Sequence, residues 1–292
     1  MRALYDLPAP AKLNLFLHVV GRRADGYHLL QSVFQLVDWA DRLHVERRDD
    51  GRLARHDLGA PLPADDLCLR AARALQAASG TALGTDISVD KQLPAGAGMG
   101  GGSSDAATTL IALNRLWGLD WPRARLLELG LTLGADVPFF IGGHNAFVEG
   151  VGERLTPIEL PAQHFAVVKP PASIATAAIF GHPLLVRNSE AVILAGLLDD
   201  DQGARRLASG YGRNDLQPPA ADNCPDVAQA ARWLESRFGN SRMTGSGSAV
   251  FARAGMDGSP MATIPAEAFP PGWVVRMCRS LGRHPLCGWV RD

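Results

Sequence analysis

The segment "PAGAGMGGGSSD" at residues 94–105 has the composition that most clearly indicates a chemical role. Glycine has no Cβ atom, so a glycine-rich backbone can turn tightly and approach a bound group closely. Such a backbone can direct several amide N–H groups towards one point, which forms an anion-binding nest. Apolar residues recur at helical spacing from Ser103 to Trp117, and the free N–H groups and dipole at the start of that helix also favour an anion. The segment therefore predicts a phosphate site.

Three side chains follow the glycines directly. Ser103 and Ser104 are expected to cap the helix, and their hydroxyls can donate to a phosphate oxygen or ligate Mg²⁺. A flexible surface loop with serine as an ordinary N-cap is the alternative interpretation. Asp105 would repel a phosphate unless a metal ion or another cation lies between them.

Two familiar glycine-rich nucleotide sites fit the segment poorly. A G-x-G-x-x-G pattern begins at Gly96, but Pro94 interrupts the strand that should lead directly into it, which disfavours a nicotinamide-dependent dehydrogenase. A Walker loop needs a lysine before its hydroxyl residue, whereas Gly102 precedes Ser103. A P-loop nucleotidase is therefore disfavoured as well.

The composition excludes several other classes of protein. The 292 residues are 47% apolar and 20% charged, which is typical of a folded globular protein. The formal net charge is −1, so no overall basic field attracts nucleic acid or an acidic membrane. The cysteines form no C-x-x-C pair, and Pro8 and Pro10 interrupt the region where a signal peptide needs an apolar run. We expect a cytoplasmic protein that binds neither nucleic acid nor membranes.

The order of the predicted elements favours an α+β fold, since strands and helices do not alternate regularly. We expect a domain boundary within residues 155–163, which divides the chain into domains at 1–160 and 161–292, and a solvated variable segment at 199–213. The expected strands are 11–20, 29–37, an edge strand at 42–46, 86–93, 164–170 and 272–278, with a strand–glycine loop–strand unit at 241–255. The expected helices are 65–80, 103–117, 121–134, 189–199 and 226–237.

Three segments together resemble the motifs of the GHMP small-molecule kinases. They are "PAKLNL" at 10–15, "PAGAGMGGGSSDAA" at 94–107 and "TGSGSAVFA" at 244–252, in the order of that family. The resemblance implies an N-terminal domain like ribosomal protein S5 and a ferredoxin-like C-terminal domain, with the active site in the cleft between them. It also implies ATP-dependent phosphorylation of a hydroxyl group.

Further segments resemble one branch of this family, whose acceptor is a cytidine-diphosphate-linked methylerythritol. "ADGYH" at 24–28 and "GADVPFF" at 134–140 fit this branch better than the homoserine or mevalonate kinases. The resemblance implies phosphorylation of the 2-hydroxyl of that acceptor in the non-mevalonate isoprenoid precursor pathway. A GHMP kinase for another small alcohol, such as homoserine or mevalonate, is the alternative.

The resemblance also assigns roles to individual residues. Asp136 would accept the proton of the acceptor hydroxyl or orient that hydroxyl, and Lys12 would keep the carboxylate ionised and polarise the hydroxyl or the phosphate. A turn carboxylate and a lysine that reaches to water are the alternatives for these two residues. ATP would bind at the glycine loop, through Pro94, Ala95, Gly96, Ala97, Gly98, Met99, Gly100, Gly101, Gly102, Ser103 and Ser104.

The substrate residues follow in the same way. Tyr27 would stack on cytosine, His28 would bond to the base, and Phe180 would close the other side, although core packing would also explain Phe180. Asn14 shares a strand face with Lys12 and is a candidate substrate contact, or a buried amide that bonds to backbone. Thr176 would bind the substrate diphosphate. The Mg²⁺ ligands stay open, and we expect a monomer or weak homodimer.

Overall fold

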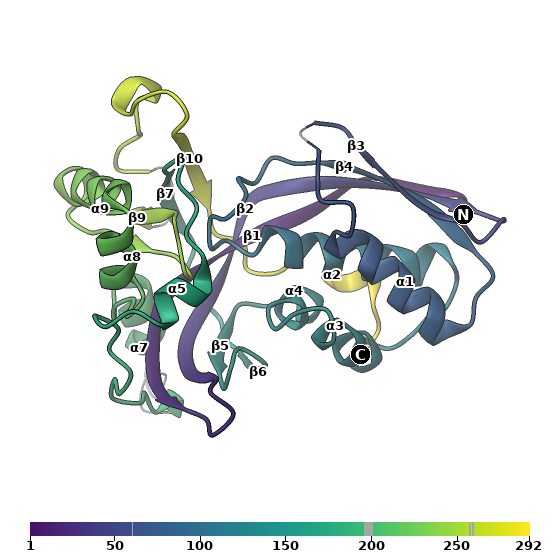
Figure 1. The fold of residues 1–292 in the computed structure, drawn as a ribbon, viewed down its shortest axis with the longest axis horizontal. Helices are drawn as coiled ribbons and strands as arrows, with labels where there is room; N and C mark the ends of the chain where they lie inside the picture. The colour runs from purple at the N-terminus through teal and green to yellow at the C-terminus, as the bar shows by residue number, and fades with distance from the viewer. Residues whose placement is uncertain (60, 196–200, 257, 259) are drawn as a thin grey trace.

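The computed structural model describes residues 1–292 except 60, 196–200, 257 and 259 (Figure 1). It is an α+β fold built on two sheets, as predicted. The strands are β1 (Ala3–Arg22), β2 (His28–Arg48), β3 (Leu53–Asp57), β4 (Gly84–Asp90), β5 (Ala146–Glu149), β6 (Arg154–Pro157), β7 (Gln163–Lys169), β8 (Arg242–Met243), β9 (Val250–Met256) and β10 (Val274–Arg279). The helices are α1 (Leu67–Ser79), α2 (Gly101–Leu116), α3 (Arg123–Leu131), α4 (Val137–Gly142), α5 (Thr176–Phe180), α7 (Asp201–Ser209), α8 (Gln217–Asn223) and α9 (Pro225–Phe238), with short 3-10 turns at Ala266–Ala268 and Cys287–Trp289.

The first sheet has the strand order β3-β4-β2-β5-β6, and β1 pairs antiparallel with β2 along most of its length. The apolar faces of α1 and α2 pack against this sheet, and α3 and α4 lie beside α2 (Figure 1). Their buried side chains form one core that includes Leu75, Leu110 and Phe140. Burial of apolar surface between sheet and helices is the main stabilising contribution here.

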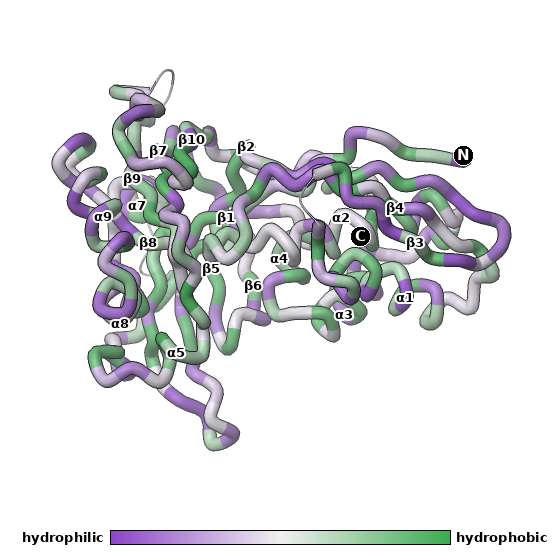
Figure 2. Tube along the Cα trace, turned by 45° about the horizontal axis from the view of Figure 1, so that its top comes forward, coloured by the Kyte–Doolittle hydropathy of each residue, from purple (hydrophilic) through white to green (hydrophobic). Residues whose placement is uncertain are grey.

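The second sheet has the order β10-β7-β9-β8, and its pairs are antiparallel. Helices α8 and α9 lie on one of its faces, and α9 buries Val227, Ala230 and Leu234 against it. A further core joins the two sheets, with Leu13 from β1, Phe165 from β7 and Phe251 from β9. In Figure 2, hydrophobic segments meet where these strands approach one another, while α9 carries hydrophilic residues on its outside.

Strand β1 belongs to both halves of the molecule. It pairs with β2 in the first sheet along most of its length, Leu17 with Ser32 included, and Leu17 also forms a bridge with Asn214 and packs in the core of the second half. The Leu17 amide donates to the Arg213 carbonyl at 2.9 Å, and the Asp215 amide donates to the Leu17 carbonyl at 2.9 Å. The middle of β1 therefore lies between the two sheets.

Several predicted boundaries are wrong. Residues 29–37 and 42–46 belong to one continuous strand, β2, and the second part lies between β1 and β4 rather than at an edge. Helix α2 begins at Gly101, so Ser103 and Ser104 lie in its first turn and do not precede it. Strands β3, β5 and β6 and helix α4 were not predicted, because each is short and lacks a full period of apolar residues. Of the predicted helix 189–199, residues 189–193 are not helical and 196–199 lie outside the described residues.

The segment 199–213 is only partly solvated, because three of its described residues are buried while five others are exposed, and this corrects part of the prediction. Leu207 and Ala208 are fully buried, although residues 199 and 200 lie outside the described part. Arg242 donates to the carbonyls of Tyr211 and Gly212 and to that of Leu15 in β1. Burial lowers the pKa of Arg242 to about 10, because the loss of surrounding water disfavours the charged guanidinium.

Residues 281–292 return from the second sheet to the first core. Leu286 and Val290 are buried among the side chains of α2, α3 and α4. The division into domains at residues 1–160 and 161–292 stays a prediction. None of the helices among the described residues is long and apolar enough to cross a membrane.

Candidate active site

The glycine loop between β4 and α2 alternates between two kinds of residue. Gly96, Gly98 and Gly100 have positive φ values of 62°, 72° and 73°, which strongly favour glycine. Ala97 and Met99 lie between them, and their side chains are buried in the core that joins the two sheets. The loop is therefore anchored by its alanine and methionine and shaped by its glycines.

Among the described residues, the backbone–backbone hydrogen bonds that join this loop to the rest of the chain are accepted by its carbonyl groups. The carbonyls of Gly96 and Ala97 accept from the amides of Ser248 and Ala249, and the Met99 carbonyl accepts from the Lys12 amide at 2.9 Å. Within the described residues, no amide N–H of 95–103 donates a hydrogen bond of ordinary geometry to another residue. Free donors of this kind on a glycine loop at a helix start form an anion site.

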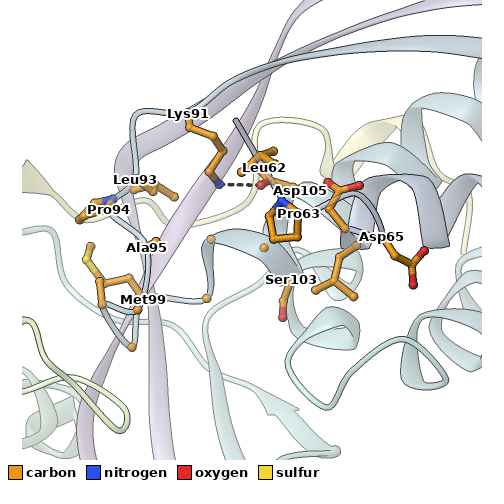
Figure 3. Close-up of a pocket in the computed structure, with 18 residues that line it drawn as sticks. Leu62, Pro63, Asp65, Lys91, Leu93, Pro94, Ala95, Met99, Ser103 and Asp105 are labelled. Atoms are coloured by element: carbon orange, nitrogen blue, oxygen red, sulfur yellow. Dashed lines mark hydrogen bonds and ion pairs between the residues drawn. The ribbon is translucent and has the colours of Figure 1, made fainter. Parts of the chain in front are cut away.

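A cavity of 480 Å³ opens above these amides (Figure 3). The glycine loop forms one wall, and Leu62 and Pro63, from the segment before α1, form part of the other. Ser103 also lines the cavity, whereas Ser104 is fully buried and its hydroxyl donates to the Pro10 carbonyl at 2.7 Å. The structure thus leaves only one of the two serine hydroxyls facing this cavity.

Lys91 provides the cation that Asp105 requires. Its Nζ lies 2.6 Å from Oδ2 of Asp105 (Figure 3). The same Nζ also bonds to Asp41. Asp41 in turn accepts from the amides of Gln92 and Leu93 at 2.6 and 2.7 Å. Burial raises the pKa of Asp105 to about 7, with Lys91 opposing and Asp41 adding to that shift. The cluster fixes both ends of the glycine loop and reduces the negative charge beside it.

Lys12 is a buried cation in the middle of β1. Its Nζ donates to Asn14 Oδ1 at 2.6 Å and lies 4.2 Å from the ring centroid of Phe34. Burial lowers the pKa of Lys12, and the nearby Asp136 carboxylate opposes that shift. Asn14 donates to Ser32 at 2.9 Å, so its amide orientation is fixed.

Asp136 completes the polar group at this point. It is the residue before α4, its side chain is 32% exposed, and its Oδ2 lies 3.5 Å from Lys12 Nζ. Both residues line a second cavity, of 260 Å³, together with Asn14. A carboxylate on a short helix and a lysine on a strand thus meet although they are far apart in sequence.

Two glycines connect the two cavities. Gly98 and Gly100 line both the cavity of the free amides and the cavity of Lys12 and Asp136. An anion held by the loop would therefore face the lysine and the carboxylate directly.

A third cavity, of 640 Å³, adjoins the second and brings together the predicted aromatic residues. Tyr27, His28, Phe180 and Thr176 all line it. His28 and Phe180 are stacked, with ring centroids 4.8 Å apart and an interplanar angle of 23°, whereas the Tyr27 side chain is largely exposed. The buried Nε2 of His28 has no hydrogen-bond partner among the described residues.

Thr176 connects the third cavity to the second glycine loop, which follows β8. Its Oγ1 lies 2.9 Å from the Ser246 hydroxyl, and both residues line the second cavity.

Burial lowers the pKa of His28, and Arg22 and Arg187 add to this effect, so the imidazole is neutral near pH 7.

Some residues of these cavities were not predicted from the sequence. They are Leu62, Pro63 and Lys91 in the first cavity, Ser32, Phe34 and Ser246 in the second, and Val151 in the second and third. Lys91 lies shortly before the glycine loop in the sequence. A cation beside Asp105 was expected, so the sequence did indicate a residue of this kind. Apolar residues such as Leu62 and Val151 carry no comparable signal.

The chain matches two models of one protein family. The model described as the N-terminal domain of GHMP kinases matches residues 66–144, and the model of their C-terminal domain matches residues 194–259. The first match contains the glycine loop and Asp136, and the second contains the loop at 244–248.

Similar proteins cover the whole chain. A 4-diphosphocytidyl-2-C-methyl-D-erythritol kinase of Methylibium petroleiphilum is 64% identical over 291 residues, which is 99% of each chain. The protein of the same name from Variovorax paradoxus is 55% identical over 298 residues, covering 99% of this chain and 100% of that one.

Solved structures agree with these matches. A crystal structure of 4-(cytidine 5'-diphospho)-2C-methyl-D-erythritol kinase has a TM-score of 0.72 at 37% identity, covering 85% of this chain and 90% of that one. A homoserine kinase from Cytophaga hutchinsonii has a TM-score of 0.67 at 15% identity, covering 97% and 96% of the two chains. The second likeness shows a shared fold alone.

The close approach of the two glycine loops makes a prediction about stability. A Cβ atom on Gly98 would lie 2.2 Å from the Thr244 carbonyl oxygen, whereas one on Gly118, which also has a positive φ, would meet nothing within 4 Å. Gly118→Ala should therefore cost only backbone strain, about 1–3 kcal/mol of unfolding free energy, and Gly98→Ala should cost distinctly more. Urea unfolding of the two variants measures the difference, and equal losses would contradict a tight contact.

The raised pKa of Asp105 makes a second prediction. The folded state keeps a proton that the unfolded chain releases between its ordinary pKa of 3.8 and about 7, so stability falls across this window as the pH rises. Asp105→Asn removes this titrating carboxyl group. The unfolding free energy of the variant minus that of the parent should therefore rise from pH 4 to pH 7, by up to about 1.4 kcal/mol per pH unit, and then level off.

Urea unfolding at several pH values measures this difference. The exposed Glu128→Gln on α3 is the control, and its difference from the parent should change little with pH. A constant difference for Asp105→Asn as well would show that Asp105 is ionised throughout the range.

Proposed function

The chain belongs to the 4-diphosphocytidyl-2-C-methyl-D-erythritol kinases within the GHMP kinase family, and from this premise we propose how its three cavities divide the reaction. The activity is ATP-dependent phosphorylation of the 2-hydroxyl of 4-diphosphocytidyl-2-C-methyl-D-erythritol, a step towards isoprenoid precursors. The relatives support this acceptor over homoserine or mevalonate, because they match over full length at 64% and 55% identity. The solved homoserine and mevalonate kinases match at only 12–16% identity.

The first cavity is assigned to ATP. The unbonded amides of residues 95–103 are donors for the phosphate oxygens, and the first turn of α2 adds its dipole. Leu62, Pro63 and Leu93 offer apolar surface to the adenine ring. Ser104 contributes only through its backbone, because its hydroxyl is buried and bonded to Pro10.

The residues around the loop also fit a bound Mg²⁺. The Ser103 hydroxyl lines the ATP cavity and is an oxygen ligand of the kind that Mg²⁺ prefers. When bound, the ion would neutralise charge on the phosphates of ATP. The carboxylates of Asp41 and Asp105 do not offer a second cation site, because the Lys91 ammonium already bonds to both of them.

The second cavity is assigned to the acceptor hydroxyl. Asp136 accepts or orients the hydroxyl proton, and Lys12 offsets the negative charge that develops between the hydroxyl and the phosphate. Asn14 bonds to Lys12 and keeps its ammonium directed into this cavity. The observation that carries the proposal is that Gly98 and Gly100 line this cavity as well as the first, so the transferred phosphoryl group need not move between sites.

The third cavity is assigned to the cytosine base and the diphosphate. A neutral His28 has one donor and one acceptor, and its buried Nε2 lacks a protein partner, so it can bond to the polar edge of a base. Tyr27 and Phe180 supply ring surfaces at the same cavity, and base stacking on aromatic rings contributes about 1–3 kcal/mol per base. The Thr176 hydroxyl, beside Ser246, would donate to the diphosphate.

We further propose a cytoplasmic protein that acts as a monomer or weak homodimer. A small, diffusible nucleotide-linked substrate supports the first expectation. The complete set of site residues on one chain supports the second, since no partner subunit is needed to build the three cavities.

The experiment that tests the function is an ATP-coupled assay over a panel of acceptors. We expect turnover with 4-diphosphocytidyl-2-C-methyl-D-erythritol and little with the uridine-linked analogue, homoserine or mevalonate. The selectivity over the uridine analogue should come from the polar edge of the base, because stacking does not distinguish the two pyrimidines. Turnover of homoserine or mevalonate alone would contradict the proposal, and equal turnover of both nucleotides would contradict the role of His28.

The role of Asp136 makes a separate prediction. Asp136→Asn keeps the size and polarity of the side chain but removes its negative charge, so kcat should fall by about 100- to 10,000-fold. The Kd for a non-hydrolysable ATP analogue should change little, because Asp136 lines the acceptor cavity and not the ATP cavity. Asp226→Asn, at a half-buried carboxylate in the first turn of α9 that lines none of the three cavities, is the control and should leave kcat unchanged. A fully active Asp136→Asn would refute the assignment.

A further inference from the structure

The position of Asp136 depends on how α4 is held. This helix has six residues, Val137–Gly142, and a helix of that length is not stable in isolation. The Asp136 side chain makes no capping hydrogen bond to the helix. The place of the carboxylate is therefore set by what packs against α4 and by what holds its other end.

The side chains of α4 place Asp136 relative to Lys12. Phe139 lies edge-on to Phe34, with ring centroids 5.2 Å apart and an interplanar angle of 88°. Phe34 is also the ring against which the Lys12 ammonium lies, at 4.2 Å. A shift of α4 would thus change the 3.5 Å separation of the lysine and the carboxylate.

The last carbonyl groups of α4 bond to segments far away in sequence. The Ile141 carbonyl accepts from Nη1 of Arg123 at 2.8 Å, and the Gly143 carbonyl accepts from the amide of His284 at 2.8 Å. Gly143 has a φ of 75°, and a Cβ there would lie 2.9 Å from Sγ of Cys287. The end of α4 is therefore enclosed by Arg123 and by residues 281–292.

Arg123 joins these parts with one side chain. Its Nη2 donates to the carbonyls of Cys287 and Val290 at 2.9 and 3.0 Å, and its own amide donates to the Arg291 carbonyl at 2.8 Å. The side chain is 13% exposed and also forms an ion pair with Asp292. The planar guanidinium suits this task, since it presents several donors in fixed directions.

The segment that Arg123 holds begins at the second sheet. The Ser280 amide donates to the Gln163 carbonyl at the start of β7, and the Leu281 amide donates to the Leu36 carbonyl in β2, both at 2.8 Å. From there residues 281–292 reach α4. Arg123 thus connects the helix that carries Asp136 to a segment anchored on both sheets.

We propose that Arg123 is a positioning residue for Asp136: together with residues 281–292 it fixes the end of α4 and so aligns the carboxylate with the acceptor hydroxyl. This inference rests on the proposed function of Asp136. Arg123 lines none of the three cavities, so its effect reaches the reaction through the placement of α4. A misplacement of about 1 Å at a reacting group can lower a rate by about 100-fold.

The test compares three variants of the full chain. Arg123→Gly removes the guanidinium, Arg123→Lys keeps the charge but not the fork of donors, and Arg125→Gln is the control on the same helix. The Arg125 guanidinium lies 3.4 Å from the ring centroid of Trp121, whereas the carbonyls of Ile141, Cys287 and Val290 accept from Arg123. Steady-state kinetics give kcat and the acceptor KM, calorimetry gives the Kd of a non-hydrolysable ATP analogue, and thermal unfolding gives Tm.

We expect kcat to fall by about 10- to 100-fold in Arg123→Gly, with the acceptor KM and the analogue Kd within about threefold of the parent. Guanidinium chloride at sub-denaturing concentration should restore much of kcat in Arg123→Gly and none in the parent. Arg123→Lys should lose part of kcat while its Tm stays near that of the parent. Arg125→Gln should keep kcat within about twofold, because it changes only the contact of an exposed guanidinium with the Trp121 ring.

Separate outcomes overturn the inference and the proposed function. If the parent phosphorylates the cytidyl acceptor and folded Arg123→Lys does so at an equal kcat, Arg123 does not position Asp136. A loss of kcat matched by equal weakening of nucleotide binding, without guanidinium rescue, would show a purely structural role and would also refute the inference. A parent that fails to phosphorylate the acceptor would instead refute the proposed function. If Arg123→Gly does not fold, the Arg123→Lys comparison decides.

Discussion

The burial of the Lys12 ammonium is the constraint on which the rest of the site depends. A buried ammonium without compensating partners costs several kcal/mol, and its neighbours must provide them. Asn14 accepts its hydrogen bond, Phe34 offers a ring face, and Asp136 supplies the opposite charge, although burial still lowers the lysine pKa. These partners come from β1, β2 and the start of α4, so the electrostatic need of one side chain fixes how three separate elements meet.

The shape of the glycine loop depends in turn on the second half of the chain. The segment after β8 hydrogen bonds to the carbonyls of Gly96 and Ala97, and this leaves the amides on the other side of the loop without partners. The Thr244 hydroxyl also lies 3.3 Å from both the Asn14 amide oxygen and the Gly98 carbonyl oxygen, so it contacts both the glycine loop and the strand of Lys12. The cavity of the glycine loop and that of Lys12 are therefore built from shared residues and not from two adjacent modules.

Short motifs in the sequence singled out the glycine loop, Lys12 and Asp136, and the structure brings these residues to adjoining cavities, while their catalytic roles stay predictions. The need for a cation beside Asp105 was also predictable from charge alone, and Lys91 meets it. The course of β2 was not, because Asp41 interrupts the apolar pattern of the strand and its burial is explained only by its two amide donors and Lys91. The role of Arg123 was not predictable either, because it binds backbone carbonyl groups, which every residue has. Two of these carbonyls belong to residues more than 160 positions away in the sequence.

Strand β1 has a consequence for how such a protein can change. Strand β1 belongs to the first sheet and also contacts Asn214 and Asp215 in the second half of the chain. A second half taken from a relative would therefore have to fit β1 at several surfaces at once. The partner of the glycine loop and the segment that encloses α4 would be exchanged in the same step. Recombination near residue 160 would therefore bring mismatches into the cavities of the glycine loop, Lys12 and Asp136. Substitutions at residues that line only the third cavity, such as Tyr27, would leave these contacts intact.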